Sequence, residues 1–134
     1  MATGFDQHFA DLDITQAQFR ILLAVWKKGG AEGIAPSMLA YHLLIERGTI
    51  SILTNRMVER GWLERQPGEN RRTYRLTLTR AGRQLLEKVI PLAVELADHT
   101  LSGISTTQLR QLRANLELIE SRLRGYEPLE KPQD

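Results

Sequence analysis

Arginine is concentrated in one stretch of the chain, and arginine is the side chain best suited to bind phosphate. Residues 47 to 83 contain nine arginines and three glutamates, which gives this stretch a charge of +6. The remaining residues carry −4, so the total charge of +2 hides the asymmetry. Because a guanidinium can bind a phosphate or a guanine through two parallel hydrogen bonds, we expect this stretch to bind nucleic acid. A solvated basic surface is the alternative.

Side chains that can contact bases are predicted on a helix from about Arg47 to Arg60. The apolar residues Ile50, Leu53 and Met57 recur at helical spacing and would hold one face of this helix to a core, and Gly61 would end it. The other faces carry side chains that can bind base edges or phosphates in the major groove of DNA. These candidates are Arg47, Thr49, Ser51, Thr54, Asn55 and Arg56.

An arginine-rich β-hairpin is predicted after this helix. Apolar and polar residues alternate in residues 62–66 and 73–78, and a turn with Pro67 and Gly68 lies between the two segments. An arginine at the tip has the reach to enter the minor groove, where narrow A·T tracts concentrate negative potential. The hairpin adds four DNA-binding candidates, which are Asn70, Arg71, Arg72 and Arg75.

Two earlier helices must position these elements. Thr15 is the predicted N-cap of a helix that runs to about Lys28, and Pro36 opens a short helix that runs to Ile45. Two short helices joined by a tight turn and followed by a hairpin make a winged helix-turn-helix. Apolar faces are predicted at Phe19, Leu22, Leu23 and Trp26 in the first helix and at Met38, Leu39, Leu43 and Leu44 in the second.

Two further helices are predicted toward the C-terminus. Thr79 would cap the first, which Pro91 would interrupt with a kink, and Ser105 or Thr106 would cap the second. Apolar residues of the last helix repeat at heptad spacing, which is typical of packing either within the monomer or on a second subunit. This stripe is Leu109, Leu112, Leu116, Ile119 and Leu123.

The chain is therefore predicted to be mostly α with a small β-hairpin wing. We expect residues 1–134 to form a single domain, with a winged helix-turn-helix DNA-binding core at 13–82. Residues 83–124, together with 1–12, would supply dimerisation helices, and 125–134 an irregular tail. Phe5 and Phe9 are spaced for one or two helical turns.

Several site classes are excluded or disfavoured. The chain has no cysteine, which removes disulfides, thiolate metal sites and thiol-oxidation switches. The three histidines, His8, His42 and His99, are scattered, so we expect no metal, and no catalytic pattern or cofactor motif is present. Phe19, Trp26 and His42 are expected to be core residues, with a ligand pocket as the alternative. No signal pattern or membrane span is found, which predicts a cytoplasmic protein.

Residues 39 to 65 resemble, without a gap, part of the MarR (multiple antibiotic resistance regulator) family of winged-helix regulators. The resemblance extends over residues 13–123 and includes Asn70-Arg71-Arg72, similar to the family's Asp-x-Arg, and Leu78-Thr79-Arg80-Ala81-Gly82, similar to its Leu-Thr-x-x-Gly. It implies a homodimer built from terminal helices, with Arg72 in the minor groove and Arg47 to Arg56 in the major groove. Asn70 keeps a hydrogen-bond acceptor but lacks the charge of the family's Asp.

The expected function is that of a sequence-specific transcriptional regulator, a repressor that binds a pseudo-palindromic operator as a homodimer. A small-molecule effector is expected, or none. Two alternatives remain: a winged-helix module that binds an acidic protein, and a monomeric architectural DNA binder.

Overall fold

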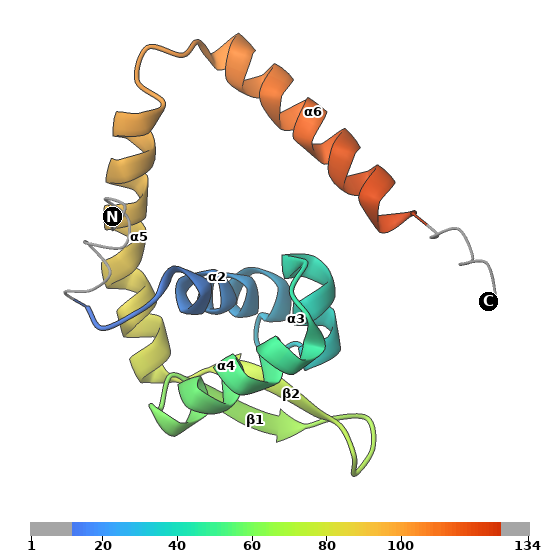
Figure 1. Ribbon diagram of the computed structural model, residues 1–134. Coiled ribbons are helices and arrows are strands. Elements are labelled where there is room, and N and C mark those ends of the chain that lie inside the picture. The colour runs from blue at the N-terminus through green and yellow to red at the C-terminus, as the bar shows by residue number, and fades with distance from the viewer. Residues whose placement is uncertain (1–11, 127–134) are drawn as a thin grey trace, which may run out of the picture. The chain divides into compact units, whose positions relative to one another are not determined.

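The computed structural model of the protein describes residues 12–126 (Figure 1). The predicted winged helix-turn-helix is confirmed: helices come first, and a two-stranded antiparallel hairpin follows them. Phe5, His8, Phe9 and most of the predicted tail lie outside the described residues. The elements are α2 (Gln16–Ala24), the π-helical turn η1 (Val25–Gly29), α3 (Pro36–Leu43), α4 (Arg47–Glu59), β1 (Leu63–Pro67), β2 (Tyr74–Leu78), α5 (Arg80–Thr100) and α6 (Thr106–Arg124).

The first described helix begins as predicted and ends differently. The hydroxyl of Thr15 accepts from the backbone N–H of Gln18 at 3.1 Å, and the Gln18 side chain accepts from the Thr15 N–H at 3.0 Å. This reciprocal cap fixes the start of α2. The helix ends in a wider π-helical turn, η1. Residues after this turn therefore no longer follow the α-helical spacing. Trp26, predicted to be core, is 47% exposed, so that prediction is wrong.

Every helix and strand of the winged helix-turn-helix contributes at least one side chain to its core. Leu39 of α3, Ile50 and Met57 of α4, and Leu76 of β2 are fully buried. The predicted inward face of α4 is thereby confirmed at Ile50 and Met57. Leu53, the third predicted residue of this face, is partly buried against the same core. The other core residues include Phe19, Ile21, Leu22, Val25, Leu63, Leu86 and Val89.

The turn between α3 and α4 begins earlier than predicted. Leu44 has φ +55° and ψ +44°, the left-handed conformation, and its N–H donates to the carbonyl of Ala40. It is 55% exposed and is not part of the helical apolar stripe, so the prediction of a helix to Ile45 is wrong by two residues. Only three residues then separate α3 from α4. This short connection fixes the position of α4 on the core.

The hairpin is anchored at its base by a third segment. β1 and β2 pair from Leu63 opposite Leu78 to Pro67 opposite Tyr74. Ile34, in the loop before α3, pairs with Leu76: each N–H donates to the other's carbonyl, at 3.0 and 2.9 Å. Because an isolated two-stranded hairpin is only marginally stable, this bridge and the buried Leu76 side chain hold the wing to the helices.

Helix α5 is capped as predicted and continues through Pro91. The Thr79 hydroxyl accepts from the Gly82 N–H at 3.0 Å, which fixes the first turn. The helix is continuous from Arg80 to Thr100, so Pro91 does not end it, and the kink at Pro91 stays a prediction. Pro91 and Glu87, four residues before it, are both exposed, so water can reach the carbonyl that Pro91 leaves without a donor.

The chain divides into two compact units between Ala97 and Asp98. In the second unit, the Ser105 hydroxyl accepts from the Gln108 N–H at 3.1 Å and begins α6, as predicted. Within its own unit α6 buries none of its residues, and its heptad stripe is left uncovered there. Among the described residues, no helix combines the length and apolar character that crossing a membrane requires.

Candidate nucleic-acid interface

Helix α4 presents a polar face opposite its buried one. Five of the six predicted base-contacting residues of this helix are exposed, and they are Arg47, Thr49, Ser51, Asn55 and Arg56. Ile50 and Met57 fasten the opposite side of the helix to the core. A helix held from behind in this way can offer its outer face to a groove without losing its own packing.

Thr54 does not belong to this face. It is 1% exposed, and its hydroxyl donates to the carbonyl of Ile50 at 2.7 Å. The residue lies four positions after Ile50 and three before Met57, which places it on the buried side of the helix. The prediction that Thr54 contacts DNA is therefore corrected: its hydroxyl is satisfied inside the protein.

Ile52 is a residue of the outer face of α4 that was not predicted from the sequence, because only side chains that can form hydrogen bonds were considered. It is 57% exposed on the outer side of α4. Helical spacing alone contains the signal, since Ile52 lies two residues after the buried Ile50 and cannot share its face.

A side chain from the hairpin fixes one of the exposed residues of α4. The guanidinium of Arg65 in β1 donates to the side-chain oxygen of Asn55. The same guanidinium lies 5.3 Å from the ring centre of Tyr74, its diagonal neighbour in the hairpin. Arg65 thus joins the outer face of α4 to the wing, and it restricts the orientation of the Asn55 amide before any ligand arrives.

The wing tip is shaped by Asn70. Its side-chain oxygen accepts from the backbone N–H of Arg72 at 2.9 Å, which closes a turn of the type that Asn and Asp favour. The Thr73 N–H donates to the Asn70 carbonyl at 3.2 Å, and the Gly68 N–H donates to the Thr73 carbonyl at 3.1 Å. Asn70 therefore supports the tip through the backbone, without needing a carboxylate charge.

The basic residues of this region fall into two groups. In residues 12–126 no ion pair engages Arg47, Arg56, Arg71 or Arg72, and all four side chains are exposed. The other group is used within the fold. Arg60 pairs with Asp13 at 2.5 Å and lies 4.0 Å from the ring centre of Trp62, and Arg75 lies 3.7 Å from Glu69.

Arg75 also lies apart from the wing tip. It lines a hollow between the hairpin and α3, together with Met38, His42 and Tyr74. The structure thus exposes eight of the ten predicted DNA-binding residues on α4 and the wing tip, whereas Thr54 is buried and Arg75 faces α3. Figure 1 shows α4 lying along the hairpin, with the turn between β1 and β2 projecting away from the helices.

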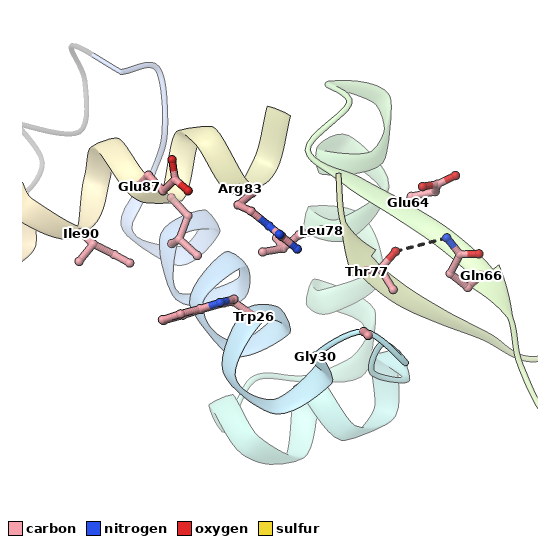
Figure 2. A pocket seen from close by; sticks show the side chains of 11 residues that line it. Trp26, Gly30, Glu64, Gln66, Thr77, Leu78, Arg83, Glu87 and Ile90 are labelled. Carbon is pink, nitrogen blue, oxygen red and sulfur yellow. Dashed lines mark hydrogen bonds between the residues drawn. The ribbon is translucent and has the colours of Figure 1, made fainter. Parts of the chain in front are cut away.

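Two hollows adjoin Trp26. One, of about 540 Å³, lies between α5 and the hairpin: Arg83, Leu86 and Ile90 of α5 line it together with Trp26, and Glu64 and Thr77 line it from the hairpin (Figure 2). The second, of about 400 Å³, is mostly apolar and is lined by Phe19, Leu23, Trp26 and Val94. His42 lines neither of them, so the structure brings together two of the three predicted pocket residues. No cluster in the described part of the chain has the ligands to hold a metal ion.

Comparisons with known proteins agree with this geometry. A model of the MarR family matches residues 12–72. The transcriptional regulator PecS of Dickeya dadantii is 31% identical over 121 residues, which is 90% of this chain and 73% of PecS. The multiple antibiotic resistance protein MarR of Escherichia coli is 32% identical over 84 residues, which is 62% of this chain and 56% of that protein.

Solved structures share the fold. A mutant of Escherichia coli MarR complexed with operator DNA has a TM-score of 0.74 at 26% identity, covering 86% of this chain and 81% of that one. The complex of Staphylococcus aureus MepR with DNA has a TM-score of 0.78 at 24% identity, covering 89% of this chain and 85% of that one.

Proposed function

This chain belongs to the MarR family, and from that premise we propose that it is a transcriptional repressor that binds operator DNA as a homodimer. One observation carries the proposal: α4 exposes a polar face, and Arg65 ties that face to a hairpin with two exposed arginines at its tip. The relatives named above include regulators solved with DNA, which supports the same reading.

In this proposal α4 lies in a major groove. Two side chains support this placement: Arg47 can reach guanine O6 and N7, and Asn55 can bridge adenine N6 and N7. The exposed hydroxyls of Thr49 and Ser51 would contact bases or phosphates. Arg71 and Arg72 at the tip extend to the adjacent minor groove, where their charge is attracted by the phosphates on both sides.

The second unit would supply the subunit contact. The apolar stripe of α6 is uncovered within its unit, and a stripe at heptad spacing is suited to pair with another helix. Residues up to Gly82 would then bind DNA, while parts of α5 and α6 would hold two copies together. Two copies of α4 about 34 Å apart would reach successive major grooves on one side of the duplex.

The test is selection of bound duplexes from a random pool by the purified full chain, at 50 and 200 mM salt. A pseudo-palindromic site is expected. With about 6 to 10 phosphate contacts, the affinity should fall by roughly 10³ to 10⁵ between the two conditions. Tight binding without sequence preference would favour a monomeric architectural protein, and absence of duplex binding would favour a module that binds an acidic protein.

An effector site would complete the regulator. We propose that the apolar hollow at Phe19 and Trp26 takes a small molecule with an aromatic or aliphatic body, because its lining is apolar and Trp26 is half-exposed beside it. Trp62, the second tryptophan, is 9% exposed, so fluorescence quenching by an apolar ligand should arise from Trp26. A Trp26→Phe variant should lose the quenching signal. If the signal persists in that variant, the site lies elsewhere.

A further inference from the structure

One apolar side chain stands in the middle of the polar face of α4. Ile52 is 57% exposed, and its neighbours on the outer side, Ser51, Asn55 and Arg56, are polar or charged. Each residue advances about 100° around a helix, so Ile52 lies about 200° from the buried Ile50. It therefore points almost directly away from the core, along the direction from which a duplex would approach.

The residue one turn earlier leaves Ile52 uncovered. Gly48 has no side chain, and the position that its Cβ would occupy has no neighbouring atom within 4 Å. Side chains on a helix lean toward its N-terminus, so Ile52 extends over the turn that contains Gly48. A single exposed apolar residue is ordinary on a protein surface. Within the described residues, Ile52 is the only exposed residue of α4 with a wholly apolar side chain.

The floor of the major groove offers one apolar group that matches this side chain. Adenine, guanine and cytosine present hydrogen-bond donors and acceptors there, whereas thymine adds a C5-methyl group. Ile52 can satisfy no donor or acceptor, so a base edge without a methyl group would lose water and gain no partner beside it. Thymine is therefore favoured for two reasons: its methyl group packs against Ile52, and the other bases would lose water there without gaining a partner.

We propose that Ile52 selects thymine at one position of each half-site by packing against its methyl group. The proposal rests on the DNA-binding function proposed above and adds a specificity determinant to it. Asn55 lies three residues further along the same helix, with its amide fixed by Arg65. The face thus combines an oriented hydrogen-bonding group with an apolar one.

The test replaces thymidine by deoxyuridine, one position at a time, in the duplex obtained by selection. Deoxyuridine lacks only the methyl group. At one thymine of a half-site the replacement should weaken binding of the unaltered protein about fourfold, the loss expected for one buried methyl group. The Ile52→Ala variant should bind both duplexes equally. The matched control Glu59→Gln, altered on the same helix but outside the residues proposed to contact DNA, should retain the fourfold difference.

Folding of the variants is checked by thermal unfolding, and an Ile52→Val variant provides a second measurement. Valine keeps both γ carbons of isoleucine and should retain most of the difference between thymine and uracil. Two results overturn the proposal while leaving DNA binding intact: a protein that tolerates deoxyuridine everywhere, or an Ile52→Ala variant that still discriminates. If no duplex is bound in preference to a scrambled one, the proposed function fails, and this inference fails with it.

Discussion

Arg65 and Asn55 are ten residues apart in the chain and hydrogen-bonded to each other, so that a strand of the wing orients a side chain on the outer face of α4. The bond makes one surface out of two elements. A charged donor also gives a stronger bond than a neutral one, which favours a single orientation of the amide.

Replacement of Arg65 by alanine should reduce sequence preference more than it reduces general affinity. The Asn55 amide would lose its charged donor, and such a bond contributes about 1.5 to 3 kcal/mol. We expect roughly tenfold weaker binding to the selected duplex and little change for a scrambled one, as measured by fluorescence anisotropy. Lysine at this position should restore part of the preference. Equal losses on both duplexes would show that Arg65 serves only to bind a phosphate.

Replacement of Arg72 by alanine should weaken binding to all duplexes while leaving the fold unchanged. Arg72 is exposed, and no described residue forms an ion pair with it, so its removal breaks no internal ion pair. The slope of log affinity against log salt concentration should decrease by about 1 for each phosphate that the variant no longer binds. Arg113→Ala in α6 is the control and should leave the slope as it is. An unchanged slope in Arg72→Ala would mean that the wing does not touch DNA.

The wing tip should depend on the side-chain oxygen of Asn70 and not on its charge. Asn70→Ala removes the acceptor for the Arg72 N–H, whereas Asn70→Asp keeps it. We expect faster hydrogen exchange at the Arg72 and Thr73 amides in the alanine variant and near-normal exchange in the aspartate variant. Similar exchange in all three proteins would contradict the assigned role of the turn.

Two glycines give a matched pair for stability. A Cβ on Gly82 would lie 2.1 Å from the carbonyl oxygen of Trp62, whereas one on Gly48 would meet no atom within 4 Å. Gly82→Ala should therefore destabilise the fold by about 2 kcal/mol or more, and Gly48→Ala should stabilise it by up to about 1 kcal/mol. Denaturant unfolding measures both. Equal effects would mean that α5 can move away from Trp62.

A charge in the apolar stripe of α6 should separate the subunits. Leu116 is 56% exposed in the single chain and lies at the middle of the stripe. Leu116→Arg would place a guanidinium in an apolar helix contact, where it would lose its hydration. Sedimentation at micromolar concentration should show a dimer for the unaltered protein and a monomer for the variant. Glu117→Gln is the control, and a dimer in all three would place the subunit interface elsewhere.

Local signals predict much of the fold correctly. Thr15, Thr79 and Ser105 are recognisable as caps because a cap needs only a side-chain oxygen and an N–H three residues later. Spacing also identifies Ile50 and Met57 as core. The prediction for Thr54 fails because it used the residue type and not the helical spacing. Thr54 lies four residues after Ile50, so it shares the buried face.

The remaining differences depend on contacts between distant residues. A charge count treats all nine arginines of residues 47–83 alike, yet Arg60 is used by Asp13, 47 positions earlier. Trp26 is exposed because the buried face of this helix is formed by Gln18, Ile21, Leu22 and Val25, which leaves Trp26 at its edge, and only the packing against the rest of the core selects that face. The orientation of Asn55 requires the register of β1 against α4, which no local pattern specifies.

The pairing of Ile34 with Leu76 divides the wing into a root and a tip. At the root, three backbone segments share hydrogen bonds around a buried leucine, whereas the hydrogen bonds that close the turn at residues 68–73 join atoms of the turn itself, and an exposed ion pair links Glu69 to Arg75. When the tip meets a groove of unsuitable width, its few local bonds can rearrange without disturbing the root. In the proposed complex, adjustment to the shape of the duplex would therefore be confined to residues 68–73, and the helices behind them would keep their register.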